Sequence, residues 1–300
     1  MIKDKEFEQL FFKPNVFSDK TGFPGRKDIV LYYDYLNRIE NCIEINKLIE
    51  SNDIDCISVR QGFDKQWDEK KKEKFLKDVK LNKITRFFSK DIDYQKLLAL
   101  CPKLCDMELD LRKGQKVDVT KAEYLKFISI TGFDGTNVVG LKDGVSLDFC
   151  GKRGLKFDFP NSLPKRLKSL SFTYYNIINL DSLNLKYLAN FYSSLGGKII
   201  QINSENEFIP YLESIIMDHG NCSFITSSFI KKAVSLKTLI IGNCAPITSL
   251  RGISSLEHVS ITGTDILDKD LTPLKSSKYV NVTDKKGFNI KNKDLPKHNR

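Results

Sequence analysis

The apolar residues of this chain recur in one short pattern that is repeated many times. Its clearest copy has Leu236, Leu239 and Ile241 at the first, fourth and sixth positions, with Cys244 three residues later. The fourth positions of successive copies are Met107, Ile128, Leu147, Leu170, Phe191, Ile215, Leu239, Val259 and Val280. These positions are 19 to 24 residues apart, a regularity that chance does not maintain over nine copies. The sequence therefore predicts a repeat array.

Each copy is too short to bury its own apolar face, so neighbouring copies must stack and share a core. The pattern L-x-x-L-x-L-x-x-N/C resembles the irregular, short leucine-rich repeats of bacterial proteins, over about residues 80–290. The resemblance implies an α/β fold: a leucine-rich-repeat solenoid with a curved parallel β-sheet on its concave side. Loops and short helices are expected on the convex side.

The segments outside the regular copies suggest how the chain is divided. Degenerate copies around Ile57 and Phe87, separated by a lysine-rich insert, extend the predicted solenoid to residues 56–290. Apolar residues at helical spacing in 29–36 and 39–49 predict a helical cap, which together with an N-terminal arm covers residues 1–55. We expect residues 291–300 to form a polar tail that frays.

The composition is that of a folded protein, because 41% of the 300 residues are apolar. The first residues mix acids and bases, unlike a signal peptide, and no apolar run is long enough to span a membrane, so we expect a cytoplasmic protein. Seven cysteines at irregular intervals predict reduced, mostly buried thiols. They are Cys42, Cys56, Cys101, Cys105, Cys150, Cys222 and Cys244.

Catalytic and metal-binding signatures are weak in this sequence. The chain has three histidines and none of the common phosphate-binding, zinc-protease or serine-nucleophile motifs. Cys101 and Cys105 lack the second ligand pair that a zinc site requires. Cys244 and His219 fall on neighbouring repeats, but Cys244 occupies a position whose side chain turns inward to the loop backbone. We therefore expect no enzyme activity, no cofactor and no metal.

The residues predicted to face the open, concave side carry the most informative charge pattern. Strand side chains alternate, so the third, fifth, seventh and eighth positions of each copy should face outward. Over the nine regular copies these positions hold six carboxylates and no lysine or arginine, and they include Ile216 and Ile240. Our candidate partner-binding residues are Asp106, Glu108, Asp110, Phe127, Asp148, Tyr174, Tyr192, Asp218, His219, His258, Tyr279 and Asp284.

Such a face suits a basic protein partner better than a nucleic acid or a membrane. The orientation of the second position is less certain: it holds lysines such as Lys168 and Lys237, but the face would carry a net negative charge even if all second positions faced the concave side. A second interpretation is that small polar residues on an exposed sheet need no partner. The net charge of +10 supports a third, an RNA-binding module that uses Trp67 and the lysines of 70–74. A leucine-rich-repeat effector or adaptor with another protein partner is a fourth.

The C-terminal segment 278–289 is similar to the endings of bacterial leucine-rich-repeat proteins encoded beside polymorphic or contact-dependent inhibition toxins. This resemblance implies an immunity protein that binds and neutralises a toxin. A nuclease would suit the carboxylates, because nucleases carry the basic surface that carboxylates can mask. The oligomeric state is left open by the sequence.

Overall fold

The computed structural model describes residues 15–17, 27–160, 163–164, 166–180, 187–194, 199–201, 211–219, 229, 232–253 and 255–297, with the backbone alone for 15–17, 152–155 and 199–201. The chain divides into two compact units. Unit 1 comprises residues 1–131 and 137–140, and unit 2 comprises residues 132–136 and 141–300. The predicted arm before residue 15, Cys222 and His298 lie outside the described residues.

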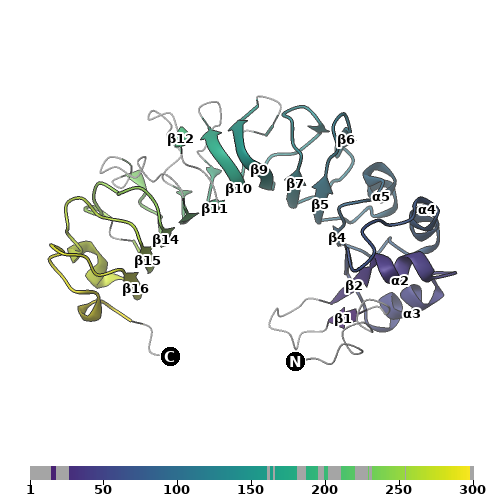
Figure 1. Cartoon of the computed structure of the whole chain (residues 1–300), viewed down its shortest axis with the longest axis horizontal. Helices are drawn as coiled ribbons and strands as arrows, with labels where there is room; N and C mark the ends of the chain where they lie inside the picture. The colour runs from purple at the N-terminus through teal and green to yellow at the C-terminus, as the bar shows by residue number, and fades with distance from the viewer. Residues whose placement is uncertain are drawn as a thin grey trace. The chain divides into compact units, whose positions relative to one another are not determined.

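Both units are parallel β-solenoids with few helices, which confirms the predicted repeat architecture at this level (Figure 1). The strands of unit 1 are β1 (Asn15–Phe17), β2 (Asp28–Tyr32), β3 (Cys56–Arg60), β4 (Arg86–Phe88), β5 (Asp106–Asp110) and β7 (Phe127–Thr131). They pair in that order, β1 antiparallel to β2 and the others parallel. The short strands β6 (Val117–Asp118) and β8 (Val138–Val139) form a separate parallel pair.

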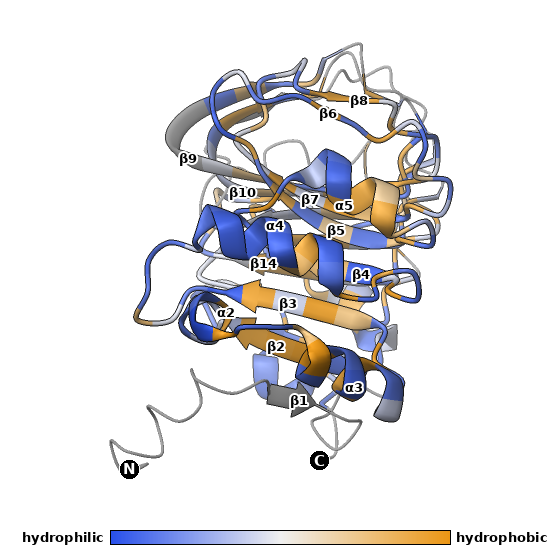
Figure 2. Ribbon diagram, turned by 90° about the vertical axis from the view of Figure 1, so that its right-hand side faces the viewer, coloured by the Kyte–Doolittle hydropathy of each residue, from blue (hydrophilic) through white to orange (hydrophobic). Residues whose placement is uncertain are grey.

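The helices of unit 1 lie between its strands along the chain. They are α2 (Tyr33–Arg38), α3 (Ile43–Ser51), α4 (Glu69–Asp78) and α5 (Tyr94–Leu100). The side chains of Asp68 and Asp93 cap α4 and α5 by accepting hydrogen bonds from backbone N–H groups of the first turn. Figure 2 shows α4 mostly blue with a short orange segment, consistent with a helix that buries only Phe75 and Leu76 among its apolar side chains.

The regular elements of unit 2 are almost all strands. They are β9 (Ser146–Asp158), β10 (Ser169–Asn179), β11 (Asn190–Ser194), β12 (Ile199–Gln201), β13 (Ser214–Asp218), β14 (Thr238–Gly242), β15 (His258–Thr262) and β16 (Tyr279–Val282). All are parallel, and β12 pairs with the second half of β10. The 3-10 helices η4 (Thr272–Ser276) and η5 (Asn292–Asp294) flank β16. Among the described residues, no helix is long and apolar enough to cross a membrane.

The predicted fourth-position residues lie in register within each unit. In unit 2 the aligned residues are Leu147, Leu170, Phe191, Ile215, Leu239, Val259 and Val280. In unit 1 they are Ile29, Ile57, Phe87, Met107 and Ile128. Each of these side chains is at most 5% exposed, so one apolar column runs through each core. The degenerate copies around Ile57 and Phe87 are confirmed as strands.

Aromatic rings reinforce the core of unit 2. The ring of Phe157 lies 4.8 Å from those of Phe149 and Phe172, between ring centroids, and 5.3 Å from that of Tyr175. Such pairs add stability beyond the area they bury. They connect β9 to β10 on the face opposite the exposed side chains.

The expected N-terminal helix is wrong for residues 29–32. These residues belong to β2, in which Ile29 and Leu31 are buried and Asp28, Val30 and Tyr32 are half-buried. The helical spacing used for the prediction includes a short apolar run, and periodicity alone does not distinguish a strand from a helix in such a run. Helices do follow, as α2 and α3, but the parallel sheet extends into the predicted cap.

The expected frayed C-terminal tail is also wrong for residues 291–297. The Val280 N–H donates to the carbonyl of Pro296 at 2.8 Å, and the Val282 N–H donates to Asn292 at 3.1 Å. Leu295 is only 4% exposed. A final strand otherwise leaves its backbone groups unpaired, and this segment satisfies them.

The cysteine prediction agrees with the described residues. Six cysteines are free thiols, and Cys42, Cys56, Cys101 and Cys244 are buried. Burial raises the pKa of the Cys101 thiol to about 12. A thiol with so high a pKa is a poor nucleophile at neutral pH.

Candidate functional site

The open face of unit 2 is the strand face on which alternate side chains are half-buried or exposed. Because β9 to β16 pair in register, these side chains form three rows across the strands. The first row is Ser146, Ser169, Asn190, Ser214, Thr238, His258 and Tyr279. The second row is Asp148, Ser171, Tyr192, Ile216, Ile240, Ser260 and Asn281, and the third is Cys150, Thr173, Ser194, Asp218, Gly242 and Thr262.

No residue in these three rows is a lysine or an arginine, whereas two are aspartates. The chain as a whole has 48 basic and 38 acidic residues, so this distribution is unusual for it. The alternation of side chains predicts that these positions share one face, and the observed register places them there. Whether a partner binds them stays a prediction.

An apolar stripe crosses the middle of the open face. It consists of Tyr192, Ile216 and Ile240, which are register partners on β11, β13 and β14. Tyr192 and Ile240 are each 38% exposed. Our candidate list contained Tyr192 but not Ile216 or Ile240, because it selected charged and aromatic residues. The sequence feature that could have identified them is the presence of two aliphatic side chains at outward positions of adjacent repeats.

Two of the three predicted acids of unit 2 flank this stripe. Asp148 lies in the row of Tyr192, two strands away, and Asp218 follows the stripe residue Ile216 on β13. An Asp218 Oδ1 atom is 2.8 Å from Nδ1 of His219. Asp284 lies outside the three rows, because it follows β16 and accepts a hydrogen bond from the Asn292 N–H at 2.6 Å.

The other predicted residues of unit 2 are dispersed. Tyr174 lies at an irregularity of β10 with a φ of 69° and is 41% exposed. His258 is exposed and Tyr279 is half-buried, and they are register partners in the first row. The structure therefore brings Asp148, Tyr192 and Asp218 near the stripe and places Tyr174 and Asp284 away from the rows.

In unit 2, the charged residues at the second position of each copy lie at the start of their strands, where lysines and glutamates alternate. The ammonium of Lys278 donates to Glu257 Oε2 at 2.6 Å. The hydrogen bond from Lys278 and the positive charges of Lys278, Lys237 and His258 hold the pKa of Glu257 below its usual range. The positive charge of the lysines at these strand starts is therefore offset by glutamate, and it does not make the open face basic.

The open face of unit 1 has a different composition. Asp106, Glu108 and Asp110 are half-buried on β5, and Phe127 on β7 is the register partner of Asp106. On the other side, however, Asp106 pairs in register with Arg86. The outward positions of the regular copies on β5 and β7 hold no lysine or arginine, but the neighbouring degenerate copy on β4 supplies a cation to this face.

Several cations lie among the acids of unit 1. Arg86 Nη2 contacts Asp55 at 2.7 Å and Asp28 at 3.2 Å. The Lys90 ammonium is 3.8 Å from a Glu108 carboxylate oxygen. Arg86 belongs to a degenerate copy that had not been included in the outward positions, so its charge was overlooked.

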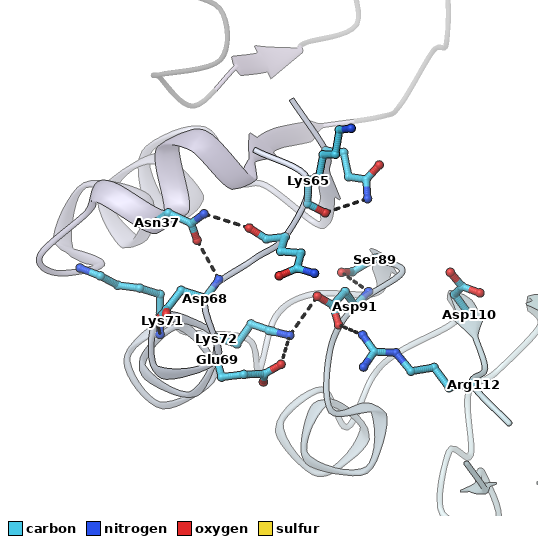
Figure 3. A network of polar contacts seen from close by, with 12 residues as sticks. Asn37, Lys65, Asp68, Glu69, Lys71, Lys72, Ser89, Asp91, Asp110 and Arg112 are labelled. Carbon is cyan, nitrogen blue, oxygen red and sulfur yellow. Dashed lines mark hydrogen bonds and ion pairs between the residues drawn. The ribbon is translucent and has the colours of Figure 1, made fainter. Parts of the chain in front are cut away.

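A network of charges joins the loops that follow the strands of unit 1 (Figure 3). Lys72 is 5% exposed, and its ammonium contacts Glu69 at 2.7 Å and Asp91 at 2.9 Å. Arg112 reaches the same Asp91 at 2.9 Å. A buried ammonium requires such neutralisation. The network connects α4 to the loops after β4 and β5, which is a structural role.

Two of the contacts proposed for RNA binding, Trp67 and Lys72, are buried, whereas Lys70 and Lys74 are exposed. Trp67 is 2% exposed, and its ring lies against Tyr33 at 6.0 Å and Phe75 at 5.2 Å between centroids. Base stacking needs an accessible aromatic face. Lys72 is also buried, so the lysine-rich helix α4 offers fewer free cations than its sequence suggests.

Cys244 has the inward orientation that its position in the repeat predicted. It is 8% exposed, and its thiol donates to the carbonyls of Gly242 at 3.2 Å and Met217 at 3.8 Å. His219 is directed instead to Asp218. The Cys244 thiol thus forms hydrogen bonds with backbone carbonyl groups. The Cys105 thiol, next to β5, donates to the carbonyl of Lys103 at 3.4 Å.

Comparisons with known proteins do not name a family for this arrangement. No protein-family model, curated protein or solved structure gives a significant match to the chain.

Proposed function

We propose that this chain is a leucine-rich-repeat protein that acts by binding a basic protein partner on the open face of unit 2. The observation that carries the proposal is the apolar stripe Tyr192, Ile216 and Ile240, in a face whose three rows contain no lysine or arginine. Exposed aromatic and aliphatic groups supply anchors in protein interfaces. Asp148 and Asp218 would steer a basic partner to them.

The assignment to leucine-rich repeats is supported by the turn after β14. The Cys244 N–H donates to Thr264 Oγ1 at 2.9 Å, and the Thr264 hydroxyl donates to the Cys244 carbonyl at 3.4 Å. Cys244 and Thr264 follow consecutive strands at a separation of 20 residues. A buried polar side chain at the same place in each turn is what the N/C position of the repeat would provide.

In its most specific form, the proposal is an immunity protein that masks a toxin. The likeness of segment 278–289 to immunity proteins of polymorphic toxins favours this partner class, and a nuclease would offer the required basic surface. The proposal involves binding alone, without a catalytic step or a cofactor.

The test is site-specific photocrosslinking in cells, with a benzophenone amino acid at position 192 or position 234. Val234 is 66% exposed but belongs to a turn, so it controls for an exposed apolar position outside the face. We expect position 192 to capture one protein with a basic contact surface and position 234 to leave it uncaptured. Equal products at both positions, or capture of an acidic protein, would contradict the proposal.

The purified complex allows a second test with matched variants. Ile240→Lys places a cation in the stripe and should weaken binding at least tenfold, because it removes an apolar anchor and repels a basic partner. Val234→Lys should leave affinity unchanged. Both side chains are exposed, so the unfolding temperature should stay close to that of the wild type. Unchanged affinity of the Ile240→Lys variant would rule out the stripe as the partner-binding surface.

A further inference from the structure

Unit 1 contains a cavity that arises because β4 is shorter than its neighbours. Strand β3 extends to Arg60 and β5 extends to Asp110, whereas β4 ends at Phe88. Only Arg86 and Phe87 of β4 pair with β5. The space has a volume of about 450 Å³ and is lined by Tyr33, Val59, Arg60, Gln61, Phe88, Lys90 and Glu108. We call it the β4 cavity.

Two cations at the β4 cavity are poorly neutralised by the protein. Among the described residues, Arg60 makes no ion pair and its side chain makes no hydrogen bond. Lys90 is 62% exposed and approaches one carboxylate, that of Glu108, at 3.8 Å. This distance is too long for a hydrogen bond. The charged side chains of the lining, Arg60, Lys90 and Glu108, sum to one positive charge, while Asp91 and Asp110 lie outside the lining.

A tyrosine hydroxyl supplies a further donor at the β4 cavity. Tyr33 is 2% exposed, lines the cavity and stacks its ring on Trp67. Its hydroxyl has no hydrogen-bond partner among the described residues. The hydroxyl is not one of the buried polar atoms that lack a partner, so it is open to the cavity and can donate to a ligand there. Burial, followed by the charges of Asp91, Asp110 and Glu108, raises the pKa of Tyr33 to about 12, which keeps the hydroxyl a proton donor.

The remaining lining supplies apolar surface. Phe88 is half-buried and Val59 is 4% exposed, so a ligand would meet an aromatic ring and an aliphatic group beside the cations. The volume is within the range of small-molecule sites, which is about 300–1,000 Å³. An apolar wall with a few convergent donors is the usual composition of such sites.

We propose that the β4 cavity binds a carboxylate that bears an apolar group, with Arg60, Lys90 and Tyr33 as donors to its oxygens. Phosphate has no apolar group to contact Phe88 and Val59, and Glu108 opposes the second charge of a dianion, so a monoanion with an apolar group fits the lining best. A free small carboxylate and the C-terminal carboxylate of a peptide share this chemistry. The site belongs to unit 1 and is independent of the stripe in unit 2.

The test is calorimetric titration of the full chain with 3-phenylpropionate, its amide and inorganic phosphate. We expect the carboxylate to bind and the amide and phosphate to bind at least tenfold more weakly. Equal binding of the carboxylate and the amide, or no carboxylate binding at millimolar concentration, overturns the proposal. A short peptide ending in phenylalanine, with a free or amidated C-terminus, distinguishes the two sources of the carboxylate.

Variants separate this site from nonspecific attraction to a basic protein. Arg60→Gln should reduce carboxylate affinity at least tenfold, and Tyr33→Phe should reduce it severalfold while preserving the ring contact with Trp67. Lys103→Gln removes an exposed cation of unit 1 that does not line the cavity, and it should have no effect. Equal losses for Arg60→Gln and Lys103→Gln contradict a built site. The unfolding temperature of each variant shows that the fold is intact.

Discussion

Unit 1 and unit 2 both expose one face of a parallel sheet, but they balance the charges on it differently. In unit 1, Arg86 contacts Asp28 and Asp55, and Lys90 lies beside Glu108. In unit 2, the three rows of the open face contain aspartates and apolar groups without a lysine or an arginine. A carboxylate on a sheet face therefore indicates a basic partner only where the chain supplies no cation of its own beside it.

Two turn glycines, one in each unit, differ in how closely their surroundings are packed, and this difference gives the largest expected effect. Gly140 in unit 1 and Gly144 in unit 2 have φ angles of +82° and +83°. A Cβ at Gly140 would lie 2.5 Å from the Thr120 backbone N, whereas a Cβ at Gly144 would meet nothing within 4 Å. Gly140→Ala should therefore cost about 3–4 kcal/mol and Gly144→Ala about 1 kcal/mol. Denaturant unfolding measures both, and equal losses would contradict the difference.

A matched pair of arginines tests the buried charges of unit 1. Arg86 and Arg251 each contact two aspartates, but their side chains are 11% and 68% exposed. Arg86→Ala should cost about 2–3 kcal/mol, because it leaves partly buried carboxylates without their cation. Arg251→Ala, in unit 2, should cost less than about 1 kcal/mol. A similar loss for both variants would show that burial does not distinguish the two clusters.

Substitutions of Tyr174 in unit 2 test whether the conformation of its backbone lowers the stability of the protein. A bulky residue with a φ of 69° is unfavourable, and glycine adopts this conformation freely. Tyr174→Gly should therefore be more stable than Tyr174→Ala by about 1 kcal/mol. The comparison of the two variants cancels the loss of the ring. If alanine were the more stable replacement, the strain would be absent in solution.

The smallest expected effect concerns acids that serve the loops of unit 2 rather than its open face. Hydrogen bonds from the Thr272 N–H and hydroxyl, and then from Asn289 and Arg251, hold the pKa of Asp270 well below its usual range. A lowered pKa in the folded state stabilises the protein above the unfolded value of about 3.9. This contribution is lost as the pH falls below that value. Asp270→Asn should lower the unfolding temperature at pH 7 and less so near pH 2, and a constant difference would contradict the assignment.

Much of the strand register follows from the sequence, because it depends on local apolar positions. Leu239 and Val259 recur at nearly constant spacing, and their burial on neighbouring strands follows from the alternation of side chains. The outward positions of unit 2 follow from the same argument. By contrast, the five residues of β2 form a run too short for periodicity to identify.

The candidate site was less predictable, because long-range pairs decide its charge. Arg86 meets Asp28 across 58 residues of sequence, and no repeat pattern indicates that contact. Trp67 stands among lysines in the sequence, yet Tyr33 and Phe75 enclose it. The stripe residue Ile240 could have been predicted as a partner-binding residue, because the repeat pattern already placed its side chain on the outward face. Arg60 and the β4 cavity depend on the early end of β4, which single-sequence reasoning places poorly.

The segment after β16 has a consequence for assembly. The Pro296 carbonyl and the Asn292 side chain accept the outward N–H groups of Val280 and Val282, and the Lys297 ammonium donates to the Val280 carbonyl at 2.6 Å. Proline has no N–H with which to recruit another strand in turn. This segment therefore covers backbone groups of β16 through which a strand of a second molecule would otherwise pair.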